Sequence, residues 1–209
     1  MVDLNFYIQA VIAMLLITFP PDPAKIVLFN SVIEKQGRAR TASAVLVAGV
    51  VLVILVGATF FGRALLNLMG INLDAFSAVG GLIIFGMGAE MLYGGAPSAA
   101  QGKSVEADGP QEDSGLIIPL SIPLLAGPGA IVTAITISST GTGLDASFAA
   151  VAGAIAVAVV VFGSFEWLGG LIARLSPTAT SLLVRIGGLL LATIGAQMLM
   201  TAIKNFFAA

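Results

Sequence analysis

The chain contains neither cysteine nor histidine among its 209 residues. Without cysteine it can form no disulfide and no thiolate metal site, and it cannot pass electrons through paired thiols. Without histidine it lacks the commonest metal ligand and the usual proton carrier near neutral pH. We therefore expect no metal site and no cofactor, and we do not expect an enzyme.

Charged side chains are also scarce. They make up 10% of the chain, against about 25% in soluble domains, while 58% of the residues are hydrophobic. This composition places the chain in a lipid bilayer. The acidic residues Glu106, Asp108, Glu112 and Asp113 gather in segment 94–115. The negative net charge of −2 therefore arises from this one segment, and it indicates no nucleic-acid partner.

The apolar residues fall into six runs, each near the roughly 20 residues that cross a bilayer as a helix. The runs are Phe6–Phe29, Ala42–Phe61, Leu73–Leu92, Leu116–Ile137, Ala146–Ile172 and Leu182–Ile203. The sequence therefore predicts an all-α membrane protein with six transmembrane helices.

Basic residues indicate how these runs are oriented. Lys35, Arg38 and Arg40 lie together between the first and second runs, and such clusters favour the cytoplasmic side. Because the runs alternate in direction, we expect both termini outside the cytoplasm. Asp3 precedes the first run and no basic segment does, so we expect this run to be a span rather than a cleaved signal peptide.

Two runs are interrupted where a helix should be continuous. The fourth contains Ile122–Ile131, which reads IPLLAGPGAI, and the first contains Phe19–Val27, which reads FPPDPAKIV. Proline removes a backbone donor and clashes with the preceding turn. Hydrocarbon cannot satisfy the freed groups, so such breaks occur inside protein or beside a wet cavity. Broken first and fourth helices are typical of a transport site.

The two halves of the chain are similar in sequence. Segment 22–27 matches 127–132, and segment 80–92 matches 187–199 at nearly the same offset. Three spans per repeat is an odd number, so the repeats would enter the membrane from opposite sides. We predict two inverted three-helix repeats joined by a linker. The first repeat covers 1–93, the flexible acidic linker covers 94–115 and the second repeat covers 116–209.

The block Ile122–Ile131, which follows an acidic linker and opens the second half, resembles the MarC family of bacterial inner-membrane proteins. Asp22 and Pro23 match the first-span pattern of that family, whereas Ala24 and Lys25 stand where it usually has a Gly-Asn pair. The family belongs with the LysE-type exporters. The resemblance implies a multi-pass inner-membrane protein that exports or exchanges small neutral amino acids or similar metabolites.

Both breaks have the pattern of a helix start, because Asp or Gly is favoured at the cap and Pro at the first helical position. Asp22 would cap its own half-helix. Gly127 has no side chain, so the N–H groups of Gly129 and Ala130 would stay open to an anion. Our hypothesis is that a substrate carboxylate binds at Gly127–Ala130 while its ammonium group faces Asp22, so that one zwitterion bridges the two halves.

The other polar residues have two interpretations each. Lys25 would pair with Asp22 as part of a simple cap, or hold the carboxylate itself. Thr133 and Thr136 share a helix face, and they would contact substrate or bond back to their own helix. Glu90 aligns with Gln197, and both would line the cavity or couple transport, or else lie at the membrane interface.

The candidate residues form one set. The substrate-binding candidates are Asp22, Pro23, Lys25, Gly127, Pro128, Gly129, Ala130, Thr133 and Thr136, and the coupling or cavity-lining candidates are Glu90 and Gln197. Small residues at four-residue spacing, such as Ala150-Ala154-Ala158, would pack helices within one chain or between copies in a homo-oligomer.

We interpret the chain as a secondary transporter of a small zwitterion. A channel, or a structural or sensory membrane protein without cargo, remains the alternative. A carrier saturates and shows counterflow, whereas a channel does not. The sequence leaves open the substrate, the direction of transport and the coupling ion.

Overall fold

The computed structural model describes residues 4–18, 40–93, 126–140, 144–167 and 176–208. These residues form six helices and no strand, which confirms the all-α prediction for this part of the chain. The helices are α1 (Leu4–Thr18), α3 (Arg40–Leu68), α4 (Leu73–Tyr93), α6 (Pro128–Thr140), α7 (Leu144–Trp167) and α9 (Pro177–Ala208).

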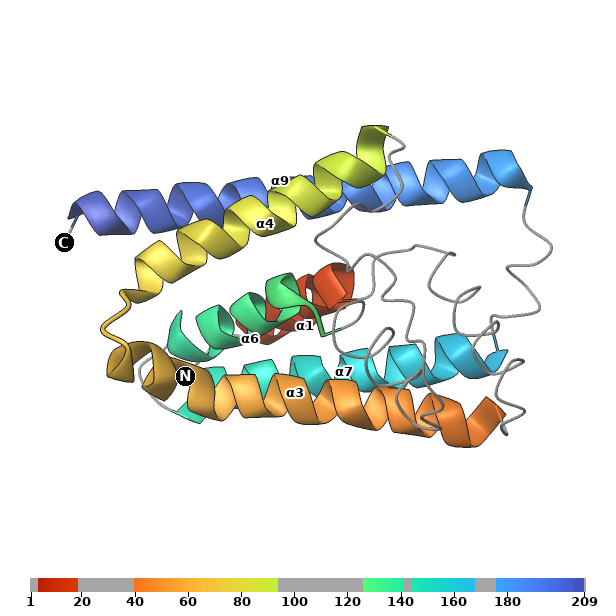
Figure 1. Ribbon diagram of the computed structural model, residues 1–209, viewed down its shortest axis with the longest axis horizontal. Coiled ribbons are helices and arrows are strands. Elements are labelled where there is room, and N and C mark those ends of the chain that lie inside the picture. Colours follow the sequence, from red (N-terminus) through yellow and green to blue (C-terminus); the bar gives the residue numbers. More distant parts are fainter. Residues whose placement is uncertain (1–3, 19–39, 94–125, 141–143, 168–175, 209) are drawn as a thin grey trace, which may run out of the picture.

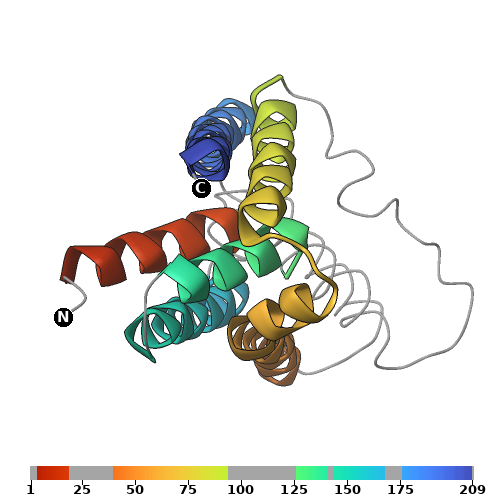
Figure 2. The same cartoon turned by 90° about the vertical axis from the view of Figure 1, so that its left-hand side faces the viewer.

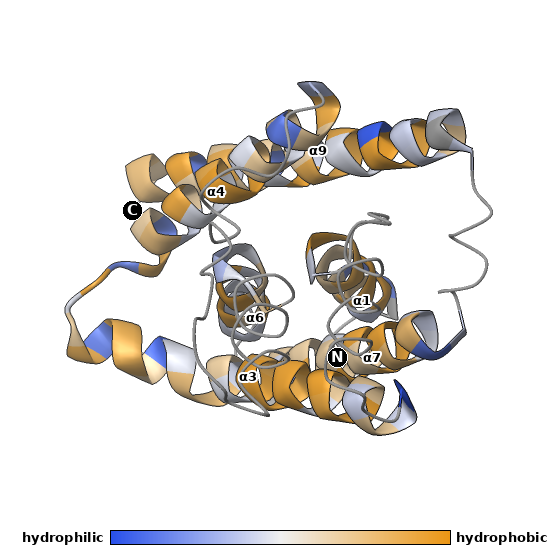
Figure 3. Ribbon diagram, turned by 45° about the vertical axis from the view of Figure 1, so that its right-hand side comes forward, coloured by the Kyte–Doolittle hydropathy of each residue, from blue (hydrophilic) through white to orange (hydrophobic). Residues whose placement is uncertain are grey.

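Four of the helices, α3, α4, α7 and α9, are long and apolar enough to cross a membrane, whereas α1 and α6 are shorter apolar helices. Many large apolar side chains of the long helices are exposed, and Figure 3 shows that these helices consist mostly of hydrophobic residues. Val53, Phe61, Leu82 and Leu189 are each more than half exposed. An apolar outer surface of this kind fits a protein that is embedded in lipid.

The six helices form three layers (Figure 1). One outer layer contains α4 and α9, the other contains α3 and α7, and the short helices α1 and α6 lie between them (Figure 2). Within each outer layer the two helices run in opposite directions (Figure 1). The two shorter described helices therefore lie between the two layers of longer ones.

The α4–α9 layer is held by glycine backbones in direct contact, which we call the glycine seam: Gly81 with Gly195 and Gly88 with Gly188. A Cβ atom on Gly81 would lie 2.8 Å from the Gly195 carbonyl oxygen, and one on Gly188 would lie 2.7 Å from the Gly88 carbonyl oxygen. Lipid provides no hydrophobic drive between helices, so close backbone packing stabilises the pair instead.

The α3–α7 layer is held by larger side chains. Leu55 of α3 and Phe165 of α7 are fully buried in one apolar cluster, together with Met14 of the middle layer. At one end, Arg40 Nε donates a hydrogen bond of 2.7 Å to the Phe165 carbonyl oxygen. This bond fastens the first residue of α3 to the last turn of α7.

The small residues at four-residue spacing pack within the chain where the structure describes them. Ala150 and Ala154 are fully buried in α7. Gly188 and Ala192 of α9 lie against Gly88 of α4. Their spacing is therefore explained by helix packing inside one chain, and contact between copies in an oligomer stays a prediction.

Candidate functional site

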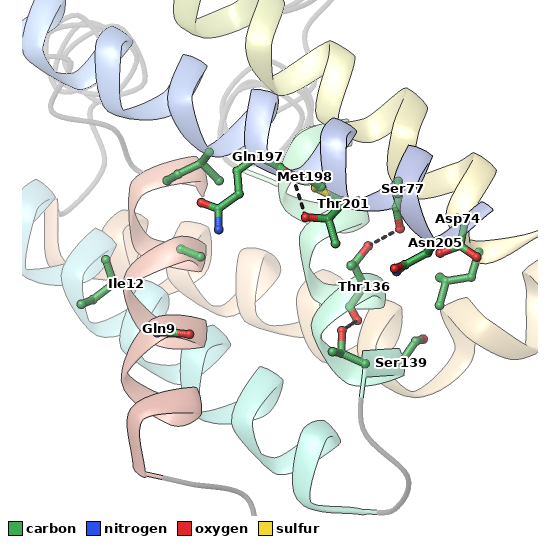
Figure 4. A pocket seen from close by; sticks show the side chains of 15 residues that line it. Gln9, Ile12, Asp74, Ser77, Thr136, Ser139, Gln197, Met198, Thr201 and Asn205 are labelled. Carbon is green, nitrogen blue, oxygen red and sulfur yellow. Dashed lines mark hydrogen bonds between the residues drawn. The ribbon is translucent and has the colours of Figure 1, made fainter. Parts of the chain in front are cut away.

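A cavity of about 740 Å³ lies between the α4–α9 layer and the α1–α6 layer (Figure 4). Four helices line it. The lining residues are Gln9, Ile12 and Ala13 of α1, Leu73, Asp74 and Ser77 of α4, Thr136, Ser139 and Thr140 of α6, and Ile194, Gln197, Met198, Thr201, Ala202 and Asn205 of α9.

The cavity wall combines a single carboxyl group with many neutral polar groups. Among the described residues that line it, Asp74 is the one with a formal charge. Gln197, a predicted cavity-lining residue, and Thr136, a predicted substrate-binding residue, both lie in this wall, whereas Glu90, the other predicted cavity-lining residue, does not. The structure therefore separates Gln197 from Glu90, although the two align in sequence.

The turn before α4 places Asp74 at the cavity. Gly70 has a φ of 68°, a left-handed conformation that glycine adopts without strain. Asn72 then caps the helix, because its Oδ1 accepts a hydrogen bond of 2.7 Å from the Asp74 N–H. A carboxylate in the first turn is also favoured by the helix dipole, so local structure alone keeps Asp74 in this position.

The hydroxyls of Ser77 and Thr136 bridge α4 and α6 at the cavity wall, with 3.0 Å between Oγ and Oγ1 (Figure 4). One turn further along α6, Ser139 is 9% exposed, and its Oγ is buried without a hydrogen-bond partner. A buried hydroxyl without a partner costs about 1–3 kcal/mol. Ser139 therefore provides an unused polar group in the wall.

The start of α6 is buried except at Pro128, which is exposed. The helix begins at Pro128, and the Gly127 carbonyl accepts from the Ile131 N–H at 3.2 Å. The helix geometry gives the N–H groups of Gly129 and Ala130 no acceptor within α6. Gly127, Gly129 and Ala130 are all buried. The second predicted break is thus seen as a helix start at Pro128, and its residues 122–125 lie outside the described residues.

Apolar side chains surround this start. A Cβ atom on Gly129 would lie 3.0 Å from Ile84 Cγ1 and 3.5 Å from Ile17 Cγ2. Val132, one turn further on, packs against Gly80 of α4. We call Ile17, Ile84 and Val132 the apolar layer, and all three are buried.

The apolar layer lies between the helix start and the cavity along α6. At about 1.5 Å per residue, Gly127 and Thr136 are roughly 13 Å apart along the helix axis. Val132 lies between these two residues in the helix. The cavity is therefore separated from the start of α6 by buried apolar side chains.

The two threonines of α6 that the sequence singled out, Thr133 and Thr136, behave differently. Thr133 Oγ1 donates a 2.8 Å hydrogen bond to the Gly129 carbonyl oxygen of its own helix. Thr136 instead meets Ser77 of α4 and lines the cavity. Asp22, Pro23 and Lys25, the candidates of the first break, lie outside the described residues, so their predicted roles stay predictions.

Sequence reasoning missed several residues of the cavity, including Gln9, Asp74, Ser77 and Asn205. One signal was present, because Gln197, Thr201 and Asn205 recur at four-residue spacing and so share a face of α9. A polar stripe on an otherwise apolar helix indicates a wet surface inside the bundle. The sequence alone does not indicate which other helices face that stripe.

Comparisons with known proteins agree on one family. The sequence model of the family described as "MarC family integral membrane protein" matches residues 4–207 of this chain. No solved structure matches the chain. The UPF0056 membrane protein MJ0972 of Methanocaldococcus jannaschii is 29% identical over 98% of this chain and 89% of its own length.

Bacterial relatives show a similar level of identity. The UPF0056 membrane protein YhcE of Escherichia coli is 30% identical over 71% of this chain and 69% of its own length. The UPF0056 membrane protein BU267 of Buchnera aphidicola is 28% identical over 98% of this chain and 95% of its own length. The family match spans nearly the whole chain, including the start of α6 and the cavity, and the chain therefore belongs to the MarC family of integral membrane proteins.

Proposed function

We propose that the chain is a secondary transporter that exports or exchanges small neutral amino acids or similar zwitterionic metabolites. The observation that carries this proposal is the relation between the cavity and the start of α6. A cavity with polar side chains in its wall leads into the bundle, and the apolar layer separates it from the start of α6, whose N–H groups suit a carboxylate. A site with access from one side and a barrier on the other suits a carrier.

The glycine seam supports the inverted repeat on which this proposal depends. In sequence, Gly81 matches Gly188 and Gly88 matches Gly195. Exchanging the two halves therefore turns the contact between Gly81 and Gly195 into the contact between Gly188 and Gly88. Because α4 and α9 are antiparallel, a two-fold axis that relates them must lie perpendicular to both helices. For helices that cross a bilayer, that axis lies in the membrane plane.

The orientation of the helices supports an opening of the cavity on one particular side of the membrane. Asp74, in the first turn of α4, and Asn205, near the end of α9, both line it. The start of α1 lies beside the start of α7, because Tyr7 Oη donates to the Asp145 carbonyl oxygen at 3.2 Å. With both termini outside the cytoplasm of a bacterial inner membrane, the cavity opens to the extracytoplasmic side.

Counterflow in liposomes tests the proposal. Purified protein would be reconstituted with unlabelled alanine, glycine or serine inside, and uptake of the labelled compound would be measured for the wild type, Gly127→Asp and Asp22→Asn. Gly127→Asp provides an internal carboxylate at the helix start, so we expect counterflow to fall at least tenfold. Asn67→Asp adds the same charge at the exposed end of α3, and we expect this control to match the wild type.

Each outcome of the counterflow experiment has a definite meaning. Saturable counterflow that is lost in Gly127→Asp supports a carrier with its site at the start of α6. Flux that does not saturate and shows no counterflow would make the protein a channel. The absence of flux for all three compounds would overturn the assignment to small amino acids.

A further inference from the structure

The cavity has a chemistry of its own, distinct from that of the helix start. The start of α6 presents N–H donors, which suit an anion. The cavity presents the Asp74 carboxylate together with hydroxyl and amide oxygens, and among its described lining residues it has no lysine or arginine. Hard oxygen ligands around one carboxylate suit a small cation.

The oxygen atoms are arranged on two facing helices. Asp74 and Ser77 are three residues apart on α4, and Thr136 and Ser139 are three residues apart on α6, so each pair shares one helix face. The hydrogen bond between Ser77 and Thr136 joins these faces. Figure 4 shows Ser77 and Thr136 pointing toward each other where α4 meets α6, with Asp74 near Ser77 on α4 and Ser139 further along α6.

Ser139 provides an independent indication of a ligand. Its Oγ is buried and has no hydrogen-bond partner, although the residue lines the cavity. The other described hydroxyls of α6 that line the cavity are partnered, because Thr136 meets Ser77 and Thr140 Oγ1 donates to the Thr136 carbonyl oxygen at 2.7 Å. A hydroxyl oxygen left unpaired in the wall of a cavity is stabilised when a bound ligand completes its contacts.

We propose that this cavity binds a small monovalent cation, either an organic ammonium group or an alkali ion, through Asp74, Ser77, Thr136 and Ser139. The inference deepens the proposed function and rests on it in one respect: the cation is the ammonium end of the arriving substrate or the ion that is transported with it. Binding itself requires no transport, so it can be measured separately.

The nearest described positive charge on α9 does not change this assignment. Lys204 is exposed at the end of the helix, and it does not line the cavity, whereas its neighbour Asn205 does. Asp74 forms no ion pair within the described residues. Lys204 therefore serves as a control, since its removal alters the local net charge without altering the wall.

The absence of cysteine makes the test direct, because a single introduced thiol is the only one in the chain. Thr201→Cys places that thiol in the cavity wall, and Phe207→Cys places one on the exposed end of α9. Each protein would be treated with a positively charged trimethylammonium thiosulfonate and with a negatively charged sulfonate thiosulfonate. The ratio of the two labelling rates reports the electrostatic potential at each thiol.

We expect this ratio to be at least about fivefold higher at Thr201→Cys than at Phe207→Cys, since one nearby charge gives roughly this effect even in water. Adding Asp74→Asn should bring the ratio at Thr201→Cys close to that at Phe207→Cys, whereas Lys204→Gln should preserve the difference. An equal ratio at the two thiols, or a difference that survives Asp74→Asn, would overturn the proposal.

Protection of the Thr201→Cys thiol identifies the kind of cation. Ethylammonium chloride and sodium chloride would each be added at constant ionic strength, balanced with N-methylglucamine chloride. Slower labelling with ethylammonium alone identifies an organic ammonium site, and slower labelling with sodium alone identifies an alkali-ion site. Failure of both to protect would overturn the proposal. Ser139→Ala should raise the half-protecting concentration about fivefold.

The two proposals fail in different ways. Protection that depends on Asp74, in a protein without counterflow, would retain the cation site and remove the transport function. Counterflow without such protection would retain transport and remove this site.

Discussion

The two faces of α4 differ in how they meet their neighbours. Toward α9, backbone touches backbone along the glycine seam, and a Cβ atom on Gly88 would lie 2.6 Å from the Gly188 carbonyl oxygen. Toward α6, the contacts are side chains: Val132 against Gly80, and Ser77 hydrogen-bonded to Thr136. The first interface leaves no room for a ligand, whereas the second adjoins a cavity of about 740 Å³.

This difference indicates which parts of the molecule move together. Backbones in direct contact cannot shift past each other without losing the packing that holds them. Side chains can change rotamer, and one hydrogen bond between hydroxyls contributes only about 0.5–1.5 kcal/mol net. We therefore expect α4 and α9 to move as one body, with the α4–α6 interface as the place where the bundle opens.

The largest effect should come from filling the glycine seam. Gly88→Leu places a side chain against the backbone of Gly188 and Ala192, neither of which can move aside. We expect it to destabilise the protein by about 3 kcal/mol, the upper part of the usual range for overpacking. The measurement is the thermal unfolding midpoint of the purified protein in detergent.

Gly86→Leu is the matched control for this prediction, because it makes the same change on the same helix and a Cβ there meets no atom within 4 Å. Its midpoint should stay within a degree or two of the wild type. Equal midpoints for Gly88→Leu and Gly86→Leu would mean that the seam is not closely packed.

A smaller effect is expected where α4 meets α6 through side chains. A Cβ on Gly80 would collide with Val132, which can be shortened by mutation. We expect Gly80→Ala to cost about 1–2 kcal/mol and Val132→Ala to relieve most of that cost. The check is a double-mutant cycle on unfolding free energies, and simple additivity of the two changes would contradict the contact.

The smallest effect concerns the hydroxyl pair. Ser77→Ala and Thr136→Val each remove one partner of the 3.0 Å hydrogen bond. We expect a coupling energy of about 1 kcal/mol or less. The labelling rate of a cysteine at Ser139 should rise in either variant if this bond helps to hold the interface closed. A fall in that rate would show that the pair keeps the cavity open.

Much of the helical architecture was predictable from the sequence, because apolar runs report burial in lipid directly. The prediction for 73–92 agrees with α4, which the structure gives as Leu73–Tyr93. The helices α3 and α9 extend beyond their predicted runs. Hydropathy marks the span, whereas the helix ends are set by local groups such as Ser176, whose Oγ accepts from the Ala179 N–H at 3.2 Å.

The start of α6 was predictable for a stronger reason, since Gly127-Pro128 combines a preferred cap with a preferred first residue. The cavity was predictable only in part. Gln197 emerged from the alignment of the two halves, and Thr136 from its place after the break. Asp74 and Ser139 were missed because hydropathy says nothing about which helices meet, and Ser139 matters only through the hydrogen bond that it lacks.

The pairing of α4 with α9 also has a consequence for biosynthesis. Gly88 is translated about a hundred residues before its partner Gly188, which at 5–20 residues per second means a delay on the order of ten seconds. During that time the glycine face of α4 has no partner in the chain. The first half must therefore persist in the membrane as an incomplete bundle until the last helix arrives. Two separately expressed halves, 1–93 and 116–209, should assemble through the same seam.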